Sequence, residues 1–485
     1  MNILVVDNEI RIIDLEAAIK VGESEARALR TPGFVPSFKC SAFENDWYAF
    51  NVVLLNMLVP LVPLNAITED LETAQINMAR SLFGESAEPI LDYLHDFPTR
   101  SSLDIRCCAN DKGTALEDLK VELENGLLSC LSADPLAPKI PGDILQFEPF
   151  GRFSINHGLF GVFPYLTNEG QESLVGQVLG SSEEYLQRGY LSGVDGALLI
   201  LEQAGLLDDI YKEAPFPDLE MGNPADISLR TGLSGLILID AVRALTTGKV
   251  RQYEMEKRAR SLASLVDTHV HYISTGNIYH AGCRSFGWAS GGAALALFTV
   301  AEVLENECLK NSARTAIDIE LHRLVKAPDG SIQVLDNNRL MPYMAEGSSG
   351  FLIAASLCPP IAERVFQSFT PEEFCAATDV RTVANGGLDL GLTGLALACH
   401  LAYKKGWVRL DLKSVGFHEQ LAMHTFPPRD GQELRGAFLG GQGGLRLSAD
   451  FSTGNAGVIR AIEVLNGRCN QWSVFPGLEP LANLW

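Results

Sequence analysis

Gly391-Leu-Thr-Gly394 followed by Leu395-Ala-Leu-Ala398 is the pattern that decides the fold, because two glycines three positions apart precede an apolar run. The pattern recurs along the last two thirds of the chain, once in a looser form. We number the copies one to seven by their first glycines: Gly158, Gly193, Gly232, Gly287, Gly347, Gly391 and Gly454. Their starts are 35, 39, 55, 60, 44 and 63 residues apart. Such recurrence is typical of a repeat architecture.

The runs after the glycines are apolar on every side, as in Ala197-Leu-Leu-Ile-Leu201, which predicts fully buried helices. Segments such as Glu254–Val266 and Cys308–Lys326 alternate with them and are amphipathic, which predicts half-buried helices. Buried helices alternating with half-buried ones predict a mainly α fold, an α/α toroid with about seven inner and about seven outer helices. We expect His269, His271 and His280 in a long loop between them.

Glycine at the start of each inner helix predicts close packing of the backbones near the axis of the toroid. The first amide groups of a helix have no partner within it, so these amides are expected to face a central cavity. Side chains just before each glycine pair are therefore candidates for a shared site.

The composition excludes several classes of protein. Lys and Arg number 38 and Asp and Glu number 60, so the net charge is −22, which argues against binding nucleic acid or an anionic membrane. A hydrophobic content of 47% and a charged content of 20% exclude a disordered chain. Ten irregularly spaced cysteines in 485 residues favour a reducing cytoplasm over a disulfide scaffold.

The apolar runs near the N-terminus are interrupted, and a proline-rich stretch divides the chain. Acidic and amide residues from Asp7 to Glu9 interrupt the first apolar run, and prolines and asparagines interrupt Ala49–Ile67, so neither a secretory signal nor a membrane span is predicted. Three prolines in Ala133–Gly142 predict a linker. We therefore predict two domains, residues 1–140 and 141–485.

The second domain resembles the cyclase domain of lanthipeptide synthetases, in particular that of the fused class III lyase–kinase–cyclase enzymes. The resemblance covers residues 150–468 and rests on four segments: Val325–Val334, Arg339–Gly350, His424-Thr-Phe-Pro427 and Arg446–Val458. It implies an α/α toroid that adds peptide cysteine thiols to dehydroalanine or dehydrobutyrine, forming lanthionine or labionin rings. The implied partner is a dehydrated ribosomal precursor peptide.

The first domain resembles the back half of a protein kinase, a partial C-lobe. Asn2 matches the catalytic-loop asparagine that holds magnesium, and Asp14 matches the aspartate of the Asp-Phe-Gly motif, here followed by Leu15 and Glu16. Thr31–Pro36 resembles the end of an activation segment, and Asp46–Phe50 resembles the start of the large kinase helix.

No glycine-rich loop, strand lysine or catalytic aspartate precedes Asn2. The resemblance thus implies an incomplete kinase, with no kinase activity from this chain alone. ATP and magnesium would bind only if a separate nucleotide-binding or lyase portion completed it.

A zinc cyclase needs a cysteine and a Cys-His pair directly before two of its glycine pairs. The residues at those places are Asn156-His157, Leu191-Ser192, Arg230-Thr231, Ser285-Phe286, Ala345-Glu346, Asp389-Leu390 and Ser452-Thr453. None is a cysteine, and Cys399-His400 lies inside a predicted helix, where adjacent side chains diverge. The sequence therefore predicts a cyclase without metal or other cofactor, as in the class III enzymes.

Cyclisation without zinc needs a base for the thiol and a donor for the enolate. His157 is the preferred base, because of the nine histidines only His157 directly precedes a glycine pair of the repeat; a helix-capping role is its alternative. Asp195 and Glu346 are candidates for a base or a peptide anchor. Arg230, Arg339 and Tyr343 are candidate donors, and for the arginines the alternative is a salt bridge to a loop carboxylate.

Two other functions remain open at this point. A carbohydrate-active α/α barrel would use two carboxylates, which Asp195, Glu346 and Asp389 would supply, although five tryptophans are few for sugar platforms. A non-catalytic scaffold would bind peptide or complement the kinase. The replacement of the family's histidine before the fourth copy by Phe286 is compatible with the scaffold.

Overall fold

The computed structural model describes residues 2–7, 9–13, 33–35, 41–61, 71–94, 116–181, 186–207, 226–248, 252–274, 289–336, 339–345, 347–380, 382–409, 416–427, 434–444 and 446–485. Helices predominate in this part of the chain, which confirms the predicted mainly α class. The α-helices are α1 (Ala42–Leu58), α2 (Leu71–Phe83), α3 (Glu88–Leu91), α4 (Leu116–Ser132), α5 (Asn168–Leu179), α6 (Val194–Gln203), α8 (Leu233–Thr247), α9 (Gln252–Ser274), α10 (Ala289–Val303), α11 (Glu307–Leu321), α12 (Ser348–Leu357), α13 (Pro359–Val365), α14 (Pro371–Ala376), α15 (Leu392–Lys404), α16 (Phe417–Met423) and α17 (Asn455–Leu465).

Three small antiparallel sheets accompany the helices. The strands are β1 (Asn2–Val6), β2 (Glu9–Ile13), β3 (Leu324–Lys326), β4 (Ile332–Asp336), β5 (Arg339–Met341), β6 (Thr425–Phe426), β7 (Phe438–Gly440) and β8 (Leu447–Ser448). They form a hairpin, β1-β2, and two meanders, β3-β4-β5 and β6-β7-β8. In the hairpin, Asn2 pairs with Ile13.

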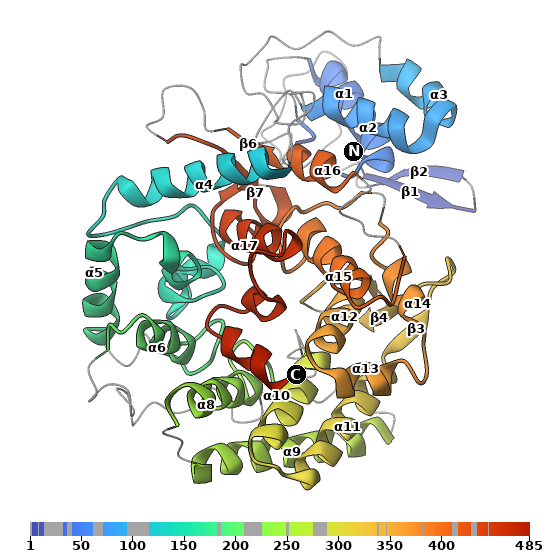
Figure 1. Cartoon of the computed structure of the whole chain (residues 1–485). Helices are drawn as coiled ribbons and strands as arrows, with labels where there is room; N and C mark the ends of the chain where they lie inside the picture. The colour runs from blue at the N-terminus through green and yellow to red at the C-terminus, as the bar shows by residue number, and fades with distance from the viewer. Residues whose placement is uncertain are drawn as a thin grey trace.

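The apolar helices that follow the glycine pairs pack on one another in chain order. Helix α6 contacts α8, and the contacts continue through α10, α12 and α15 to α17 (Figure 1). Helix α17 in turn contacts the 3₁₀ helix η8 (Leu159–Tyr165), so the last copy of the repeat lies beside the first. The amphipathic helices α9 and α11 pack outside this circuit against α8 and α10. The full toroid, with its number of inner and outer helices, stays a prediction.

A relay of backbone hydrogen bonds joins the segments just before the glycine pairs. The amide of Asn156 donates to the carbonyl of Leu191 over 3.0 Å, and the amide of Ser192 donates to Arg230 over 3.2 Å. On the other side, Ala345 donates to Asp389, Asp389 to Ser452, and Ser452 back to Asn156, over 2.9, 3.1 and 2.9 Å. These bonds hold the residues before the first, second, third, fifth, sixth and seventh glycine pairs at the same height along the axes of the apolar helices.

In the six copies whose second glycine the structure describes fully, that glycine is required for space. A Cβ atom on Gly457 would overlap the carbonyl oxygen of Phe451, and one on Gly196 would overlap that of Tyr190. The apolar residue six positions before this glycine packs against the next copy: the side chain of Phe451 in the seventh copy lies against Gly161 in the first. A larger residue here would push two copies apart.

The glycine before each apolar helix is its N-cap, as expected: Gly193, Gly232, Gly347, Gly391 and Gly454 precede α6, α8, α12, α15 and α17. Gly287 lies outside the described residues. The first copy departs from the expected long helix, since Gly158 begins only the 3₁₀ helix η8. Pro164 within η8 explains this, because proline donates no backbone hydrogen bond and disfavours a continuing α-helix.

The loop expected around three histidines is partly wrong. Helix α9 runs from Gln252 to Ser274, so the backbone of His269 and His271 is helical. The helix predicted from the amphipathic pattern of Glu254–Val266 is two turns longer at its C-terminal end than the sequence interpretation allowed. His280 lies outside the described residues.

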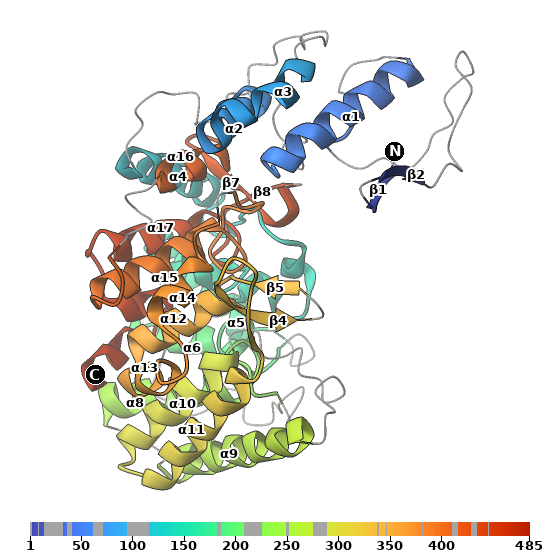
Figure 2. The same cartoon turned by 90° about the vertical axis from the view of Figure 1, so that its right-hand side faces the viewer.

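The N-terminal helices pack on the edge of the repeat region. Residues of α1–α3, among them Leu55 and Leu91, share a hydrophobic cluster with Met423 of α16 and Phe426 of β6. Both views place these helices at the end of the molecule that carries α16 (Figures 1 and 2). Helix α4 joins the main core and packs on α17. The predicted division at residue 140 stays a prediction.

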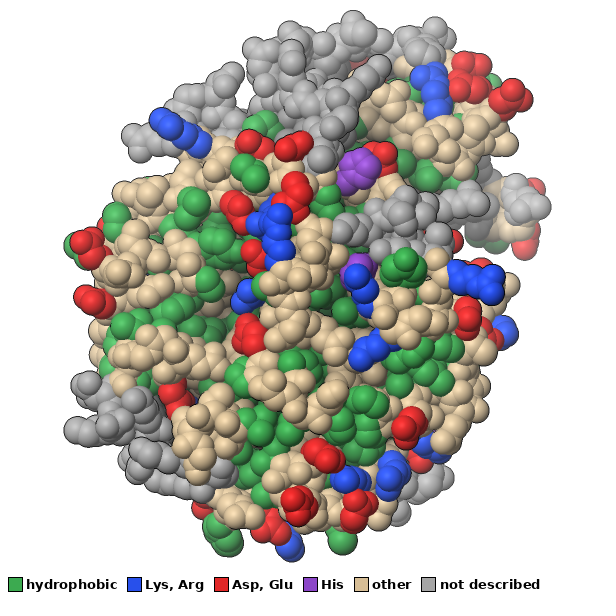
Figure 3. Space-filling view, viewed as in Figure 1, with side chains coloured by type: hydrophobic (Ala, Val, Ile, Leu, Met, Phe, Trp, Pro, Cys, Tyr) green, Lys and Arg blue, Asp and Glu red, His purple; other side chains and the backbone are tan. Residues whose placement is uncertain are grey.

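The surface carries both basic and acidic side chains, as the amounts of these residues in the sequence lead one to expect. On the face seen in Figure 3, Lys and Arg side chains stand singly or in small groups among Asp and Glu, with hydrophobic patches between them. Within the described residues, no helix combines the length and the apolar character needed to cross a bilayer.

Candidate active site

The residues before four of the glycine pairs line one cavity of about 210 Å³. Copies one, three, six and seven contribute, and loop residues complete the wall. The lining comprises His157, Arg230, Asp389, Leu390, Ser452, Thr453, Leu145, Asn385, Gly387 and Gln442. The relay of backbone hydrogen bonds explains this convergence, because it holds these segments at one level around the circuit.

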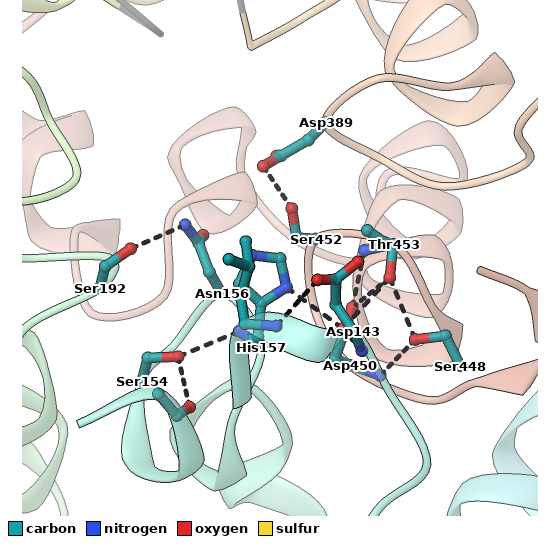
Figure 4. Close-up of polar contacts among 12 residues, drawn as sticks. Asp143, Ser154, Asn156, His157, Ser192, Asp389, Ser448, Asp450, Ser452 and Thr453 are labelled. Carbon is teal, nitrogen blue, oxygen red and sulfur yellow. Dashed lines mark hydrogen bonds and ion pairs between the residues drawn. The ribbon is translucent and has the colours of Figure 1, made fainter. Parts of the chain in front are cut away.

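His157 lies in the wall of this cavity and is 5% exposed. A turn fixes its backbone: the Oγ of Ser154 accepts the amide of His157 over 3.1 Å and donates to the carbonyl of Gly151 over 2.9 Å. Its Nδ1 lies 3.3 Å from Oδ2 of Asp450 (Figure 4). The ring is thus oriented by a carboxylate from the seventh copy.

Asp450 is fully buried and held by several donors. The amide and the Oγ1 of Thr453 donate to its Oδ1 over 2.7 and 3.0 Å, and the amide of Asp143 donates to its Oδ2 over 3.1 Å. These bonds hold the carboxylate in place. With Asp450 as the acceptor for Nδ1 of His157, Nε2 is left as the nitrogen that exchanges a proton.

The charge around His157 changes its basicity. Burial lowers the pKa of His157, but the hydrogen bond and negative charge of Asp450, with the charges of Asp389 and Asp143, outweigh burial. The net result is a pKa raised above the usual 6.5. A raised pKa makes the imidazole of His157 a stronger proton acceptor, which is the property that a general base uses.

A second network lies on the other side of the cavity. An Nη atom of Arg230 donates to Oδ2 of Asp389 over 2.8 Å, and the Oγ of Ser452 also donates to this oxygen. Arg230 belongs to the third copy and Asp389 to the sixth, which are not neighbours in the backbone relay, so the ion pair spans the cavity. Arg230 therefore forms the salt bridge to a loop carboxylate that was predicted as the alternative to a donor role. This salt bridge lies in the wall of the cavity.

The two networks meet at consecutive residues of the seventh copy. Ser452 binds Asp389, and Thr453 binds Asp450, which binds His157 (Figure 4). Ser452 and Thr453 therefore fix both carboxylates relative to each other.

Other sequence candidates lie elsewhere. Both Nε and an Nη of Arg188 donate to the carboxylate of Asp195, which also accepts the amide of Gly189; Asp195 is not part of the cavity lining. Arg339 is exposed on β5. Tyr343 is half-buried against the main core, away from the lining, and burial raises its pKa.

The remaining candidates fall largely outside the described residues. Glu346 and Asp14 lie outside them, and Asn2 lies in β1 with its side chain likewise not described. Cys399 and His400 are buried in α15, as their helical placement predicted. Within the ranges that the structure describes, no group of three or more His, Cys, Asp or Glu residues is arranged to hold a metal ion. Independence from zinc stays a prediction.

Sequence reasoning missed Asp450 and Asp143 as partners of His157. Asp450 lies within the family-like segment Arg446–Val458, four positions before Gly454, so the repeat register offered a weak signal. Nothing in the sequence links it to His157, which is 293 positions away. Two of the carboxylates proposed for a carbohydrate enzyme are separated, since Asp389 lines the cavity whereas Asp195 pairs with Arg188 outside the lining; the third, Glu346, lies outside the described residues.

Comparison with known proteins gives one weak relative. The chain is 26% identical to the probable SapB synthase of Streptomyces coelicolor over 533 aligned positions, which cover 96% of this chain and 54% of that protein. The chain thus spans about half the length of this relative. No family model matches the chain.

Proposed function

We propose that this chain takes part in lanthipeptide biosynthesis and that its repeat region is a cyclase toroid without zinc. It adds a cysteine thiol of a dehydrated precursor peptide to dehydroalanine or dehydrobutyrine. The observation that carries the proposal is the convergence of His157, held by Asp450, and Arg230, held by Asp389, in one cavity. The likeness to a probable SapB synthase and the resemblance to class III lanthipeptide synthetases support the same class.

The cavity fits the chemistry of thiol addition. A cysteine thiol has a pKa of about 8.5, so only a few per cent is thiolate at pH 7. Neutral His157, with Nδ1 hydrogen-bonded to Asp450, takes the thiol proton at Nε2. The same group returns a proton after the carbon–sulfur bond has formed. General acid–base help of this kind is worth about 10²–10⁴-fold in rate.

The test supplies pre-dehydrated precursor peptide to the purified chain and counts free thiols by alkylation and mass spectrometry. We expect His157→Ala to slow ring closure by about 10²-fold or more while peptide binding changes little. His418→Ala is the matched control, because His418 is a histidine of α16 whose side chain is 41% exposed and does not line the cavity.

The outcomes separate the rival functions. Ring closure no faster than in buffer, with tight peptide binding, would replace the cyclase by a non-catalytic scaffold. Hydrolysis of oligosaccharides without action on dehydrated peptides would favour the carbohydrate enzyme. Equal rates for the wild type and His157→Ala would keep the cyclase but remove His157 from its mechanism.

The N-terminal part is proposed to be a partial kinase C-lobe. The hairpin β1-β2 and the helix α1 follow in the order that the resemblance implies. Asn2 and Asp14 would hold magnesium with ATP only if a separate kinase or lyase portion completed the site. We expect no phosphate transfer from labelled ATP to a serine-rich precursor by this chain alone, and robust incorporation would contradict the kinase alignment.

A further inference from the structure

Arg230 has donor capacity that its ion pair does not use. Its side chain is 27% exposed and lines the cavity together with His157. A guanidinium carries five N–H donors. Asp389 takes one Nη, and the buried Nε has no hydrogen-bond partner among the described residues. An unsatisfied buried donor is costly, so a ligand oxygen near this guanidinium would be stabilised.

The position of Arg230 is set by two buried polar residues, Asp389 and Ser452. Asp389 is almost fully buried, accepts from Arg230 and Ser452, and keeps the guanidinium in the cavity. Ser452 is held in turn, since its amide donates to the carbonyl of Asn156, the residue before His157. The backbone of Asn156-His157 therefore carries the base, His157, and also positions the donor, Arg230, through Ser452 and Asp389.

We propose that Arg230 is a second catalytic residue of the cyclase, donating a hydrogen bond to the carbonyl oxygen of the dehydroamino acid, with Asp389 and Ser452 as its positioning residues. The inference rests on the proposed function. It assigns the donor to Arg230 instead of Arg339, which is exposed, or Tyr343, which lies outside the lining.

The reaction balances without a co-reactant. The thiol proton passes to Nε2 of His157, and the sulfur forms a bond with the β-carbon of the dehydroamino acid. The electron pair of the carbon–carbon double bond moves to the carbonyl oxygen as an enolate, which Arg230 stabilises. The enolate then collapses to the carbonyl as the α-carbon takes a proton from the imidazolium of His157. The product is a thioether, and His157 is neutral again.

The experiment measures kcat, KM and the pH dependence of ring closure with pre-dehydrated peptide. We expect Arg230→Gln to lower kcat about 10²–10³-fold, as for loss of an oxyanion donor, with KM changed less than about threefold. The pH-rate limb that reports His157 should persist, since the base is intact, and its midpoint should not fall, because Asp389 then loses the cation that offsets its charge. Arg230→Lys should recover part of kcat because it keeps a cationic donor.

A matched ion pair controls for structural damage. Arg188 is buried to a similar degree, 21% exposed, and pairs with Asp195 in the second copy, outside the cavity. Arg188→Gln should lower thermal stability while kcat stays within about threefold of the wild type. Ser452→Ala should lower kcat about tenfold by loosening Asp389.

Each result decides a separate point. A wild-type chain that closes no rings overturns the proposed function itself. An active wild type with Arg230→Gln equal to it, or with Arg230→Gln and Arg188→Gln equally impaired, overturns the role of Arg230 alone. Should Arg230→Gln fail to fold, the kcat of folded Arg230→Lys and Ser452→Ala decides: wild-type values in both overturn the proposal.

Discussion

The second and seventh copies of the repeat share a backbone but place their carboxylates differently. In the second copy, Asp195 is satisfied within the copy, by Arg188 and the amide of Gly189. In the seventh, Asp450 binds its own Thr453 and also reaches His157 of the first copy. The repeat therefore supplies a common backbone arrangement, and a contact between copies, such as that of Asp450 with His157, brings the polar groups together in the cavity.

The largest effect should come from the shared frame. Gly457→Val in the seventh copy and Gly196→Val in the second should each lower the free energy of unfolding by roughly 3 kcal/mol or more, because the new side chain overlaps a carbonyl oxygen. Urea denaturation measures both. Gly176→Ala in α5 is the control, since its Cβ meets nothing within 4 Å, and it should be neutral or slightly stabilising. A loss of stability in only one of these two valine variants would show that the backbone packing differs between the two copies.

The next effect separates the two carboxylates. Asp450→Asn should slow ring closure by about 10²-fold or more, because the amide cannot support the imidazolium of His157. Asp195→Asn should instead leave the rate within about threefold and destabilise the fold, since it breaks a largely buried ion pair. Steady-state rates and thermal melts distinguish the variants. Equal loss of activity in both would erase the distinction between the copies.

Two buried histidines extend the comparison to pH. Burial lowers the pKa of His424 to about 4, against the partial effect of a hydrogen bond with the Val383 backbone, whereas the carboxylates around His157 raise its pKa. As the pH falls from 7 to 4, unfolded His424 gains a proton that the folded chain resists, so stability should fall by about 3 kcal/mol. His157 acts oppositely: its contribution is complete below pH 6.5 and is lost as the pH rises through its folded pKa.

Proton NMR of the histidine rings measures this directly. The His157 signal should titrate with a midpoint above 6.5, and the His424 signal should not move until well below pH 5.5 in the folded chain. In Asp450→Asn, the midpoint of His157 should decrease while His424 is unchanged. A common midpoint for both histidines would contradict the assigned surroundings.

The smallest effect is expected in the fifth copy. Arg339→Ala on β5 should leave ring closure within about twofold and stability within about 0.5 kcal/mol, because the side chain is exposed and does not line the cavity. Tyr343→Phe should lower the rate far less than His157→Ala, because Tyr343 does not line the cavity either. A large loss in either would place the fifth copy in the site. The thiol assay and melting curves suffice for both.

Much of the frame was predictable because it depends on local pattern. Paired glycines before apolar runs predicted where α6, α8, α12, α15 and α17 begin, since only glycine tolerates the crowding there. The periodicity of residues 254–266 predicted α9, although not its end. The prediction of an apolar α-helix was wrong for the first copy, because Pro164 interrupts the segment and only a 3₁₀ helix forms.

The candidate site was predictable only in part. The repeat pointed to the residues before the glycine pairs, and His157, selected by its place directly before Gly158, lines the cavity. Asp195 and Tyr343 met the same criteria of residue type and proximity yet lie outside the cavity lining. The number of positions between a residue and the glycine pair predicts how far along the helix axis the residue lies. It does not predict whether the side chain points into the cavity.

The repeat, its buried helices and the small residues at their starts can be inferred from local sequence, because these follow from hydrophobic period and backbone space. Which polar groups meet depends on how the copies pack on one another. His157 and Asp450 are 293 positions apart, and Arg230 and Asp389 are 159 apart. Such pairs arise only when the last copy of the repeat packs against the first and the third faces the sixth across the cavity, and a local pattern carries no information about that packing.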